Sequence, residues 1–96
     1  MIMNKYESVV IINPNLDEEA IKAIIAKFTD LINSDGKVDS VDELGKKKLA
    51  YEIRKHKEGY YLVFHFEANP NLIVELERNY RIQDEIIKFI VIKEEK

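Results

Sequence analysis

Cysteine is absent from this chain of 96 residues, so disulfide bonds and thiolate metal sites are excluded. No apolar run approaches the roughly 18 residues that a membrane-spanning helix needs, and we therefore predict no membrane span. The N-terminus also lacks the charged segment, apolar stretch and small-residue cleavage site that mark a secretory signal. Together these absences lead us to expect a cytoplasmic protein.

Glycine and proline are scarce, with three and two residues respectively. An apolar content of 46% and a charged content of 34% are typical of a folded globular chain and not of a disordered one. The length suits one hydrophobic core but not two. We therefore predict a single domain over residues 1–96, with residues 93–96 as a short polar tail.

The side-chain combinations from which catalytic sites are built are also missing. His56 and His65 lie nine positions apart without metal-binding spacing, and there is no glycine-rich phosphate loop. The serines have no nucleophile motif around them. An acylphosphatase-type enzyme would need an arginine in the loop after its first strand, where this chain has Asn13-Pro14-Asn15. We predict a non-enzymatic protein that holds no metal or cofactor.

The apolar residues recur with the periods of strands and helices. Asn15 or Asp17 is a candidate N-cap for the first helix, which Gly36 would end in the left-handed conformation. Asn69 and Pro70 mark the start of the second helix. In chain order we predict strand 6–12, helix 17–33, strand 37–53 with a bulge or bend at Gly45, strand 60–66, helix 70–81 and strand 86–92.

This order of elements is the β-α-β-β-α-β plan of the ferredoxin-like, or split βαβ, fold, an α+β architecture. It predicts a four-stranded antiparallel sheet with two helices on one face. Right-handed crossovers then put strands 6–12 and 60–66 in the centre of the sheet and the other two strands at its edges. The largely apolar character of both central strands fits this arrangement.

Positive charge is concentrated in one stretch, although the chain has a formal net charge of −3. Six of the 15 basic residues fall in the 12 positions from 46 to 57, where Glu52 is the one acid. We expect Arg54 to Gly59 to form a charged hairpin loop. Lysines on an edge strand can simply discourage aggregation, but this cluster exceeds that need and favours binding to a polyanion. Its members are Lys46, Lys47, Lys48, Arg54, Lys55 and Lys57.

An RNA-recognition motif shares the predicted fold but requires a specific third strand. In that motif a basic residue, a glycine and an aromatic residue come first, and a small residue and a second aromatic residue precede a valine. Here Glu58-Gly59-Tyr60-Tyr61-Leu62-Val63 fits the glycine and the first aromatic residue, but Glu58, Tyr61 and Leu62 are the wrong residue types at their positions. Base stacking on the open sheet is therefore disfavoured.

The run Gly45 to Ile53, GKKKLAYEI, followed by Lys55 and Gly59-Tyr60-Tyr61, is a distinctive signature. It closely resembles that of the bacterial small-subunit ribosomal protein six family. The resemblance covers essentially the whole chain, and its further matches are Tyr6-Glu7, Asn13-Pro14, Phe66-Glu67-Ala68 and Arg81-Ile82.

The resemblance implies a structural component of the small ribosomal subunit that binds the central domain of 16S ribosomal RNA together with the eighteenth small-subunit protein. It implies phosphate contacts for Lys47, Lys48, Lys55 and Arg81, which would position the protein without reading base sequence. Tyr61 and Val63, on the exposed face of the sheet, are expected to contact the protein partner. The full set of expected RNA-binding residues is Lys46, Lys47, Lys48, Arg54, Lys55, Lys57 and Arg81.

A small-molecule-binding regulatory domain is the alternative hypothesis. Ferredoxin-like domains also serve that purpose, and a fold alone does not determine function. The basic cluster separates the two hypotheses, because a metabolite-binding domain has no need of it. On this ground the ribosomal hypothesis leads, with no membrane and no small-molecule substrate expected.

Overall fold

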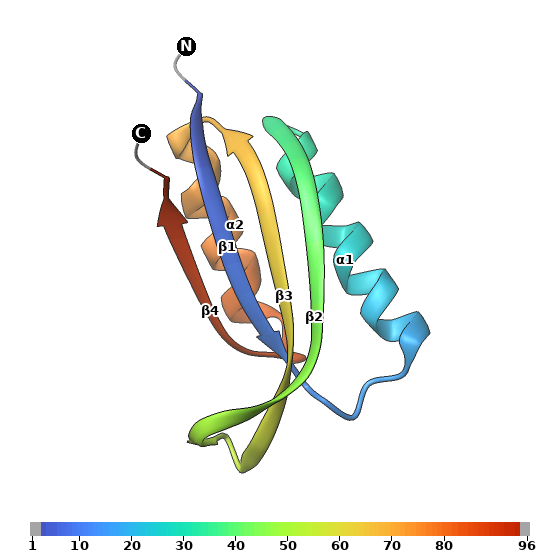
Figure 1. Cartoon of the computed structure of the whole chain (residues 1–96). Helices are drawn as coiled ribbons and strands as arrows, with labels where there is room; N and C mark the ends of the chain where they lie inside the picture. The colour runs from blue at the N-terminus through green and yellow to red at the C-terminus, as the bar shows by residue number, and fades with distance from the viewer. Residues whose placement is uncertain (1–2, 95–96) are drawn as a thin grey trace.

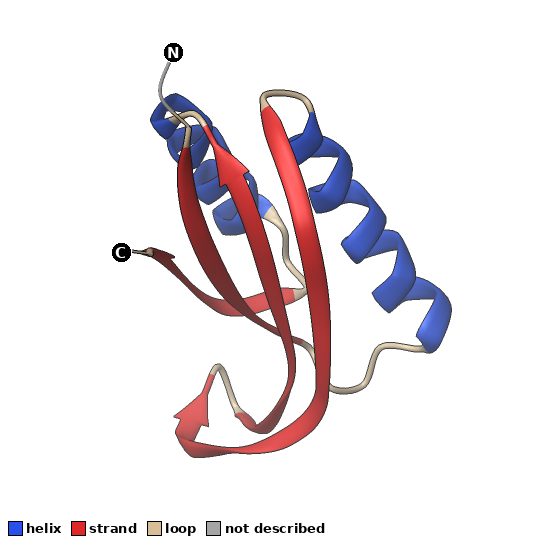
Figure 2. Ribbon diagram, turned by 45° about the horizontal axis from the view of Figure 1, so that its top comes forward, coloured by secondary structure: helices blue, strands red, loops and turns tan. Residues whose placement is uncertain are grey.

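Two helices cover one face of a four-stranded antiparallel sheet in the computed structural model, which describes residues 3–94 (Figure 1, Figure 2). The strands lie in the order β2-β3-β1-β4, so the predicted ferredoxin-like topology with two central and two edge strands is confirmed. No helix in the described part of the chain is long and apolar enough to cross a membrane. The elements are β1 (Asn4–Ile12), α1 (Glu18–Asn33), β2 (Gly36–Ile53), β3 (His56–Ala68), α2 (Pro70–Ile82) and β4 (Ile86–Lys93).

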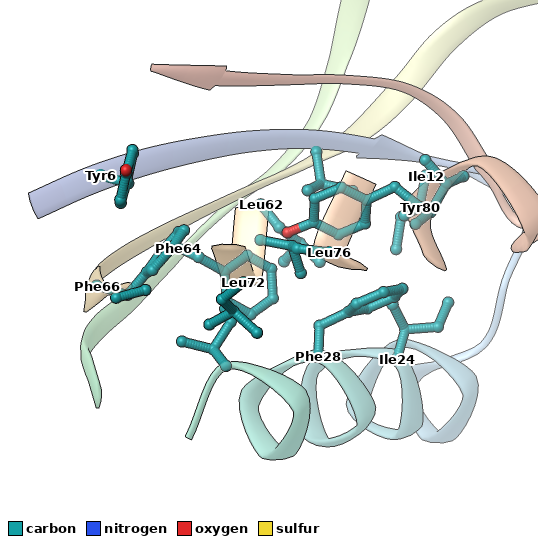
Figure 3. Close-up of a cluster of buried hydrophobic side chains, with 14 of the residues drawn as sticks. Tyr6, Ile12, Ile24, Phe28, Leu62, Phe64, Phe66, Leu72, Leu76 and Tyr80 are labelled. Atoms are coloured by element: carbon teal, nitrogen blue, oxygen red, sulfur yellow. The ribbon is translucent and has the colours of Figure 1, made fainter. Parts of the chain in front are cut away.

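The core lies between the helices and the sheet face that they cover (Figure 3). Every second residue of β1 and β3 points into it, as the strand period requires. Phe28 of α1 and Tyr80 of α2 meet in its middle, with their ring centroids 4.7 Å apart. The largest fully buried side chains are those of Val10, Ile12, Phe28, Ile32, Leu62, Phe64, Phe66, Leu76 and Tyr80.

One polar pair is buried inside this core. The hydroxyl oxygens of Ser8 and Tyr80 lie 2.8 Å apart, within hydrogen-bonding distance. Burial raises the pKa of the Tyr80 phenol well above its usual value, and the hydrogen bond to Ser8 offsets only part of this effect. The pair also identifies the two faces of the sheet, because Ser8 faces the helices and its neighbours Glu7 and Val9 therefore face away from them.

Both helices begin at the predicted capping residues. The Asp17 carboxylate accepts a hydrogen bond from the Ala20 amide at 2.8 Å, and the Asn69 side chain accepts one from the Asn71 amide at 3.1 Å. The prediction for Gly36 is wrong, because this residue is not in the left-handed region. It instead begins β2 so close to the backbone of Glu67 and Ala68 that a β-carbon would clash.

Strand β2 has 18 residues whereas its partner β3 has only 13, so its register shifts at three places. One shift is at Gly45, whose φ of 83° confirms the predicted bulge or bend. The largest shift lies between Lys48 and Ile53. Bulges bend a strand and increase its twist. The far end of the β2–β3 hairpin accordingly curls away from the line of the sheet (Figure 1).

The loop predicted over residues 54–59 is wrong. The hairpin turn consists of Arg54 and Lys55 alone, with φ of 48° and 69°, and His56 already belongs to β3. Positive φ at both turn residues is the signature of a tight type I′ connection. Gly59 is therefore a strand residue, buried and packed against Ile11.

The ends of the sheet extend slightly beyond their predicted limits. Strand β1 begins at Asn4, and β4 continues to Lys93, which had been assigned to the polar tail. The backbone amide of Glu94 then donates to the carbonyl of Lys5 at 2.8 Å. Residues 95 and 96 of the predicted tail lie outside the described residues.

Candidate nucleic-acid interface

The curled end of the β2–β3 hairpin packs back on the face of the sheet that no helix covers. Leu49 of β2 forms a second, small hydrophobic cluster with Ile11 of β1 and Ile87 of β4. The ammonium group of Lys88 on β4 lies 3.2 Å from the Tyr51 hydroxyl. These contacts fix the hairpin, and with it the basic cluster, against the first half of β4.

All six basic residues predicted between positions 46 and 57 are exposed. None of them forms an ion pair with a carboxylate within residues 3–94, where the ion pairs involve other residues. The ammonium group of Lys47 lies 5.9 Å from the centre of the Tyr61 ring, on the helix-free face. Strand alternation directs Lys46 and Lys48 to the opposite side. The cluster thus presents free positive charge on both sides of the hairpin.

Arg81 is distant from the hairpin in the sequence but lies near the hairpin turn in the structure. It lines a cavity of about 290 Å³ together with Arg54 and Lys88. Lys88 is a basic residue that was not among those predicted from the sequence. Lys88 is the only charged residue in the apolar run 86–92, and that interruption was a signal available in the sequence. We call this cavity the basic cleft, and its lining residues are Arg54, Tyr80, Arg81, Ile86, Ile87, Lys88 and Phe89.

The predicted partner residues, Tyr61 and Val63, both lie on the helix-free face. Tyr61 is half-buried, but Val63 is only 7% exposed and contributes little surface of its own. Sequence reasoning missed the more exposed apolar side chains there, which are Tyr51 at 64%, Ile90 at 48% and Ile92 at 47%. Register shows that Ile90 and Ile92 share this face, since they pair with Val9 and Glu7.

A groove runs between the helix-free face and the curled hairpin. Its volume is about 230 Å³ and its lining is mostly apolar, with residues from β1, β2, β3 and β4. Lys88 is the one charged residue in the lining. The main lining residues are Val9, Ile11, Leu49, Tyr51, Tyr61 and Ile90, and we call this surface the apolar groove.

The other end of the helix-free face has a different character. The His65 ring nitrogens lie 3.0 Å from an Asp42 carboxylate oxygen and 3.9 Å from one of Glu94. His65 is thus a strand residue, in agreement with the predicted strand 60–66, and its neighbours here are carboxylates. The face therefore has acidic groups at one end, apolar residues in its middle and lysines at the hairpin.

Comparison with known proteins gives one consistent result. Residues 5–93 match the family model described as "Ribosomal protein S6". The chain is 54% identical over 94 residues to "Small ribosomal subunit protein bS6" from Clostridium perfringens, covering 97% of this chain and 99% of that protein. It is 52% identical to the protein of the same name from Clostridium novyi over 95 residues, which are 98% of this chain and all of the relative.

A solved structure agrees with these sequence matches. The crystal structure of 30S ribosomal protein S6 from Thermotoga maritima superimposes with a TM-score of 0.91 at 36% identity. The match covers 97% of this chain and 89% of the Thermotoga chain. The same fold therefore extends over nearly the full length of both proteins.

Proposed function

Because this chain belongs to the ribosomal protein S6 family, we propose that it binds the central domain of 16S ribosomal RNA jointly with the eighteenth small-subunit protein. Family membership itself makes the chain a structural component of the small subunit of the bacterial ribosome, in the cytoplasm, and not an enzyme. It also selects the ribosomal hypothesis over a small-molecule-binding regulatory domain. The RNA segment and the protein partner are the parts that we propose.

The observation that carries the RNA part of the proposal is the unpaired charge of the hairpin. Lys46, Lys47, Lys48, Arg54, Lys55 and Lys57 are exposed without carboxylate partners among the described residues. Surface lysines and arginines in such a group gain affinity for RNA by releasing the counterions that surround its phosphates. The end of the hairpin extends past the neighbouring strands (Figure 1), so RNA can approach the side that faces away from the apolar groove, where strand alternation places Lys46 and Lys48.

The helix-free face supports the protein part of the proposal. Tyr51 and Ile90 are exposed apolar side chains that line one groove, and Ile92 is exposed on the same face. Such a patch on a small protein commonly marks an interface. Lysines at the hairpin border the same face. A partner bound in the groove would therefore lie beside the RNA phosphates, which is the arrangement that joint binding needs.

A titration tests this proposal. A fragment of the 16S central domain is titrated with this protein, alone and in the presence of the eighteenth small-subunit protein, and a 16S fragment of equal length from another domain serves as control. We expect the partner to raise affinity for the central-domain fragment about tenfold or more, within the usual range of coupled binding. Absence of binding to that fragment under both conditions would overturn the proposal.

A further inference from the structure

We propose that the basic cleft binds a single phosphate group of the RNA backbone, held jointly by Arg54, Arg81 and Lys88. The inference rests on the proposed RNA-binding function and makes it more specific. Three basic residues from three separate elements, the hairpin turn, α2 and β4, line this one cavity. They would then act together on one ligand and not as independent contacts.

The cleft contains positive charge that no residue of its lining neutralises. None of its lining residues is acidic. Within residues 3–94, no carboxylate forms an ion pair with Arg54, Arg81 or Lys88. Like charges gathered in one cavity repel one another, and a bound anion removes that repulsion. The unoccupied charge thus favours an anionic ligand.

The acid nearest to Lys88 along the chain faces another cavity. Glu85 accepts a hydrogen bond from the Gln83 side chain at 2.6 Å, and both residues line a cavity with Lys27 against α1. Glu85 is thereby held on the other side of the α2–β4 connection. The positive charge of the basic cleft is not offset from this direction.

The donors in the cleft suit a phosphate. Arg54 donates one guanidinium N–H to the carbonyl of Ile86 at 3.5 Å, which leaves its other donors available. The guanidinium of Arg81 lies 6.0 Å from the centre of the Phe89 ring, so an aromatic wall limits its positions. Planar guanidinium groups match the spacing of phosphate oxygens, and two of them can grip one phosphate from different sides.

Lys88 completes the set as a point charge. Lys88 lines both the basic cleft and the apolar groove, and its ammonium group lies on the groove side, 3.2 Å from the Tyr51 hydroxyl. That interaction leaves two of its three N–H groups free to turn toward a phosphate in the cleft. A simpler role exists for Arg81 alone, since a cation near the end of α2 complements the helix dipole. That role does not explain why Arg54 and Lys88 converge on the same cavity.

The salt dependence of RNA binding distinguishes one shared phosphate from separate contacts. We compare the full chain with Arg54→Gln, Arg81→Gln, the double variant and the triple variant that adds Lys88→Gln, all in the presence of the eighteenth small-subunit protein. Each single substitution should lower affinity about tenfold, as expected for a charge-assisted hydrogen bond. The double variant should lose far less than the product of the two single losses, because both residues hold the same ligand.

The slope of log K against log salt gives the number of phosphates. A shared phosphate predicts that the slope falls by about 0.7 to 0.9 in the double and in the triple variant alike, whereas separate phosphates predict about twice and three times that change. Arg78→Gln is the matched control, because Arg78 is an exposed α2 residue that pairs with Glu75 at 3.6 Å, outside the cleft. We expect it to leave affinity and slope unchanged.

The possible failures are distinguishable. Unchanged affinity and slope in the double variant, with the parent protein binding normally, would overturn the cleft proposal alone. Failure of the parent protein to bind the RNA would overturn the proposed function and the cleft with it. Loss of binding to the partner protein in the absence of RNA would show that the cleft serves a protein carboxylate, which also overturns the phosphate assignment.

Discussion

Gly59 of β3 packs so closely against the side chain of Ile11 on β1 that no β-carbon fits between them. This contact lies where the hairpin leaves the plane of the sheet, beside Leu49. The absence of a side chain at Gly59 is therefore what allows the hairpin to curl back on the helix-free face. Together with the Leu49 cluster and the Lys88–Tyr51 contact, this close approach sets the position of the basic cluster.

Replacing Gly59 by alanine should lower the free energy of unfolding by about 1–3 kcal/mol, the usual cost of overpacking a buried site. Urea denaturation measures the change. Ile11→Ala removes the clashing methyl group, so the double variant should lose less stability than the two single changes predict together. A Gly59→Ala protein as stable as the parent would show that the hairpin is not held at this point.

The hairpin turn offers a variant that separates stability from binding. Arg54 and Lys55 both have positive φ, a conformation that costs non-glycine residues free energy. Replacing them with asparagine and glycine should raise the free energy of unfolding by about 1 kcal/mol and weaken RNA binding by removing two charges. Urea denaturation and an RNA titration measure the two effects, and a fall in stability would contradict the turn geometry.

Changing Lys47, Lys48 and Lys55 together to alanine should weaken assembly with RNA without harming the fold. All three side chains are exposed and form no ion pair among the described residues, so stability should change by no more than about 0.5 kcal/mol per site. Circular dichroism during thermal unfolding checks the fold, and a titration checks binding. Loss of folding would mean that this segment of β2 is packed differently.

Ile90 on the helix-free face should contribute to binding of the protein partner. It is 48% exposed at the apolar groove, so Ile90→Ser should cost affinity for the partner while leaving the core intact. Val74→Ser is the control, because Val74 is 71% exposed on α2, away from the groove. Calorimetric titration with the eighteenth small-subunit protein should show a loss for Ile90→Ser alone. Equal partner affinities of the two variants would show that the partner binds at another surface.

Because Tyr80 is buried beside Ser8, we expect the free energy of unfolding to fall at alkaline pH. Because burial raises the pKa of Tyr80, the folded state binds its proton more tightly than the unfolded state does. This difference adds to the free energy of unfolding fully below about pH 10, the pKa of the tyrosine in the unfolded chain. Above that pH the contribution is lost, by up to about 1.4 kcal/mol per pH unit. Denaturation between pH 8 and 11 should show this decline.

The variant Tyr80→Phe tests the assignment of this decline. In this variant the free energy of unfolding should fall less steeply with rising pH. A smaller decline should remain, because burial and the nearby Glu43 carboxylate also raise the pKa of Tyr60. At pH 7 the variant should be about 1–3 kcal/mol less stable, because the Ser8 hydroxyl loses its partner. Adding Ser8→Ala should recover part of that cost. An alkaline decline that Tyr80→Phe does not reduce would assign it to another group.

The topology could be predicted from the sequence because its signals are local. The apolar runs of β1 and β3, the helical spacing in α1 and the caps at Asp17 and Asn69 each depend on neighbouring residues only. Gly36 and Gly59 were misinterpreted for the opposite reason. Both are required by close approach of a distant segment, Ala68 in one case and Ile11 in the other. A sequence pattern does not reveal such a contact.

The interface could be predicted only in part. The basic cluster is contiguous in the sequence, so its composition was visible, but the two-residue turn was not, because Arg54-Lys55 lacks the asparagine or glycine usual at positive φ. The basic cleft could not be predicted, because its three basic residues come from separate elements and line one cavity only in the folded chain; they are Arg54, Arg81 and Lys88. The exposure of Ile90 relative to Val63 likewise depends on the packing of neighbouring strands.

The most direct test of the proposed function is the salt dependence of RNA binding by the parent protein and by the variant with Lys47, Lys48 and Lys55 changed to alanine. Both are titrated onto the 16S central-domain fragment with the eighteenth small-subunit protein present. Three to five phosphate contacts predict a slope of log K against log salt of about −2 to −4.5 for the parent and a clearly smaller magnitude for the variant. Equal slopes for the two proteins would contradict the claim that the hairpin docks on RNA phosphates.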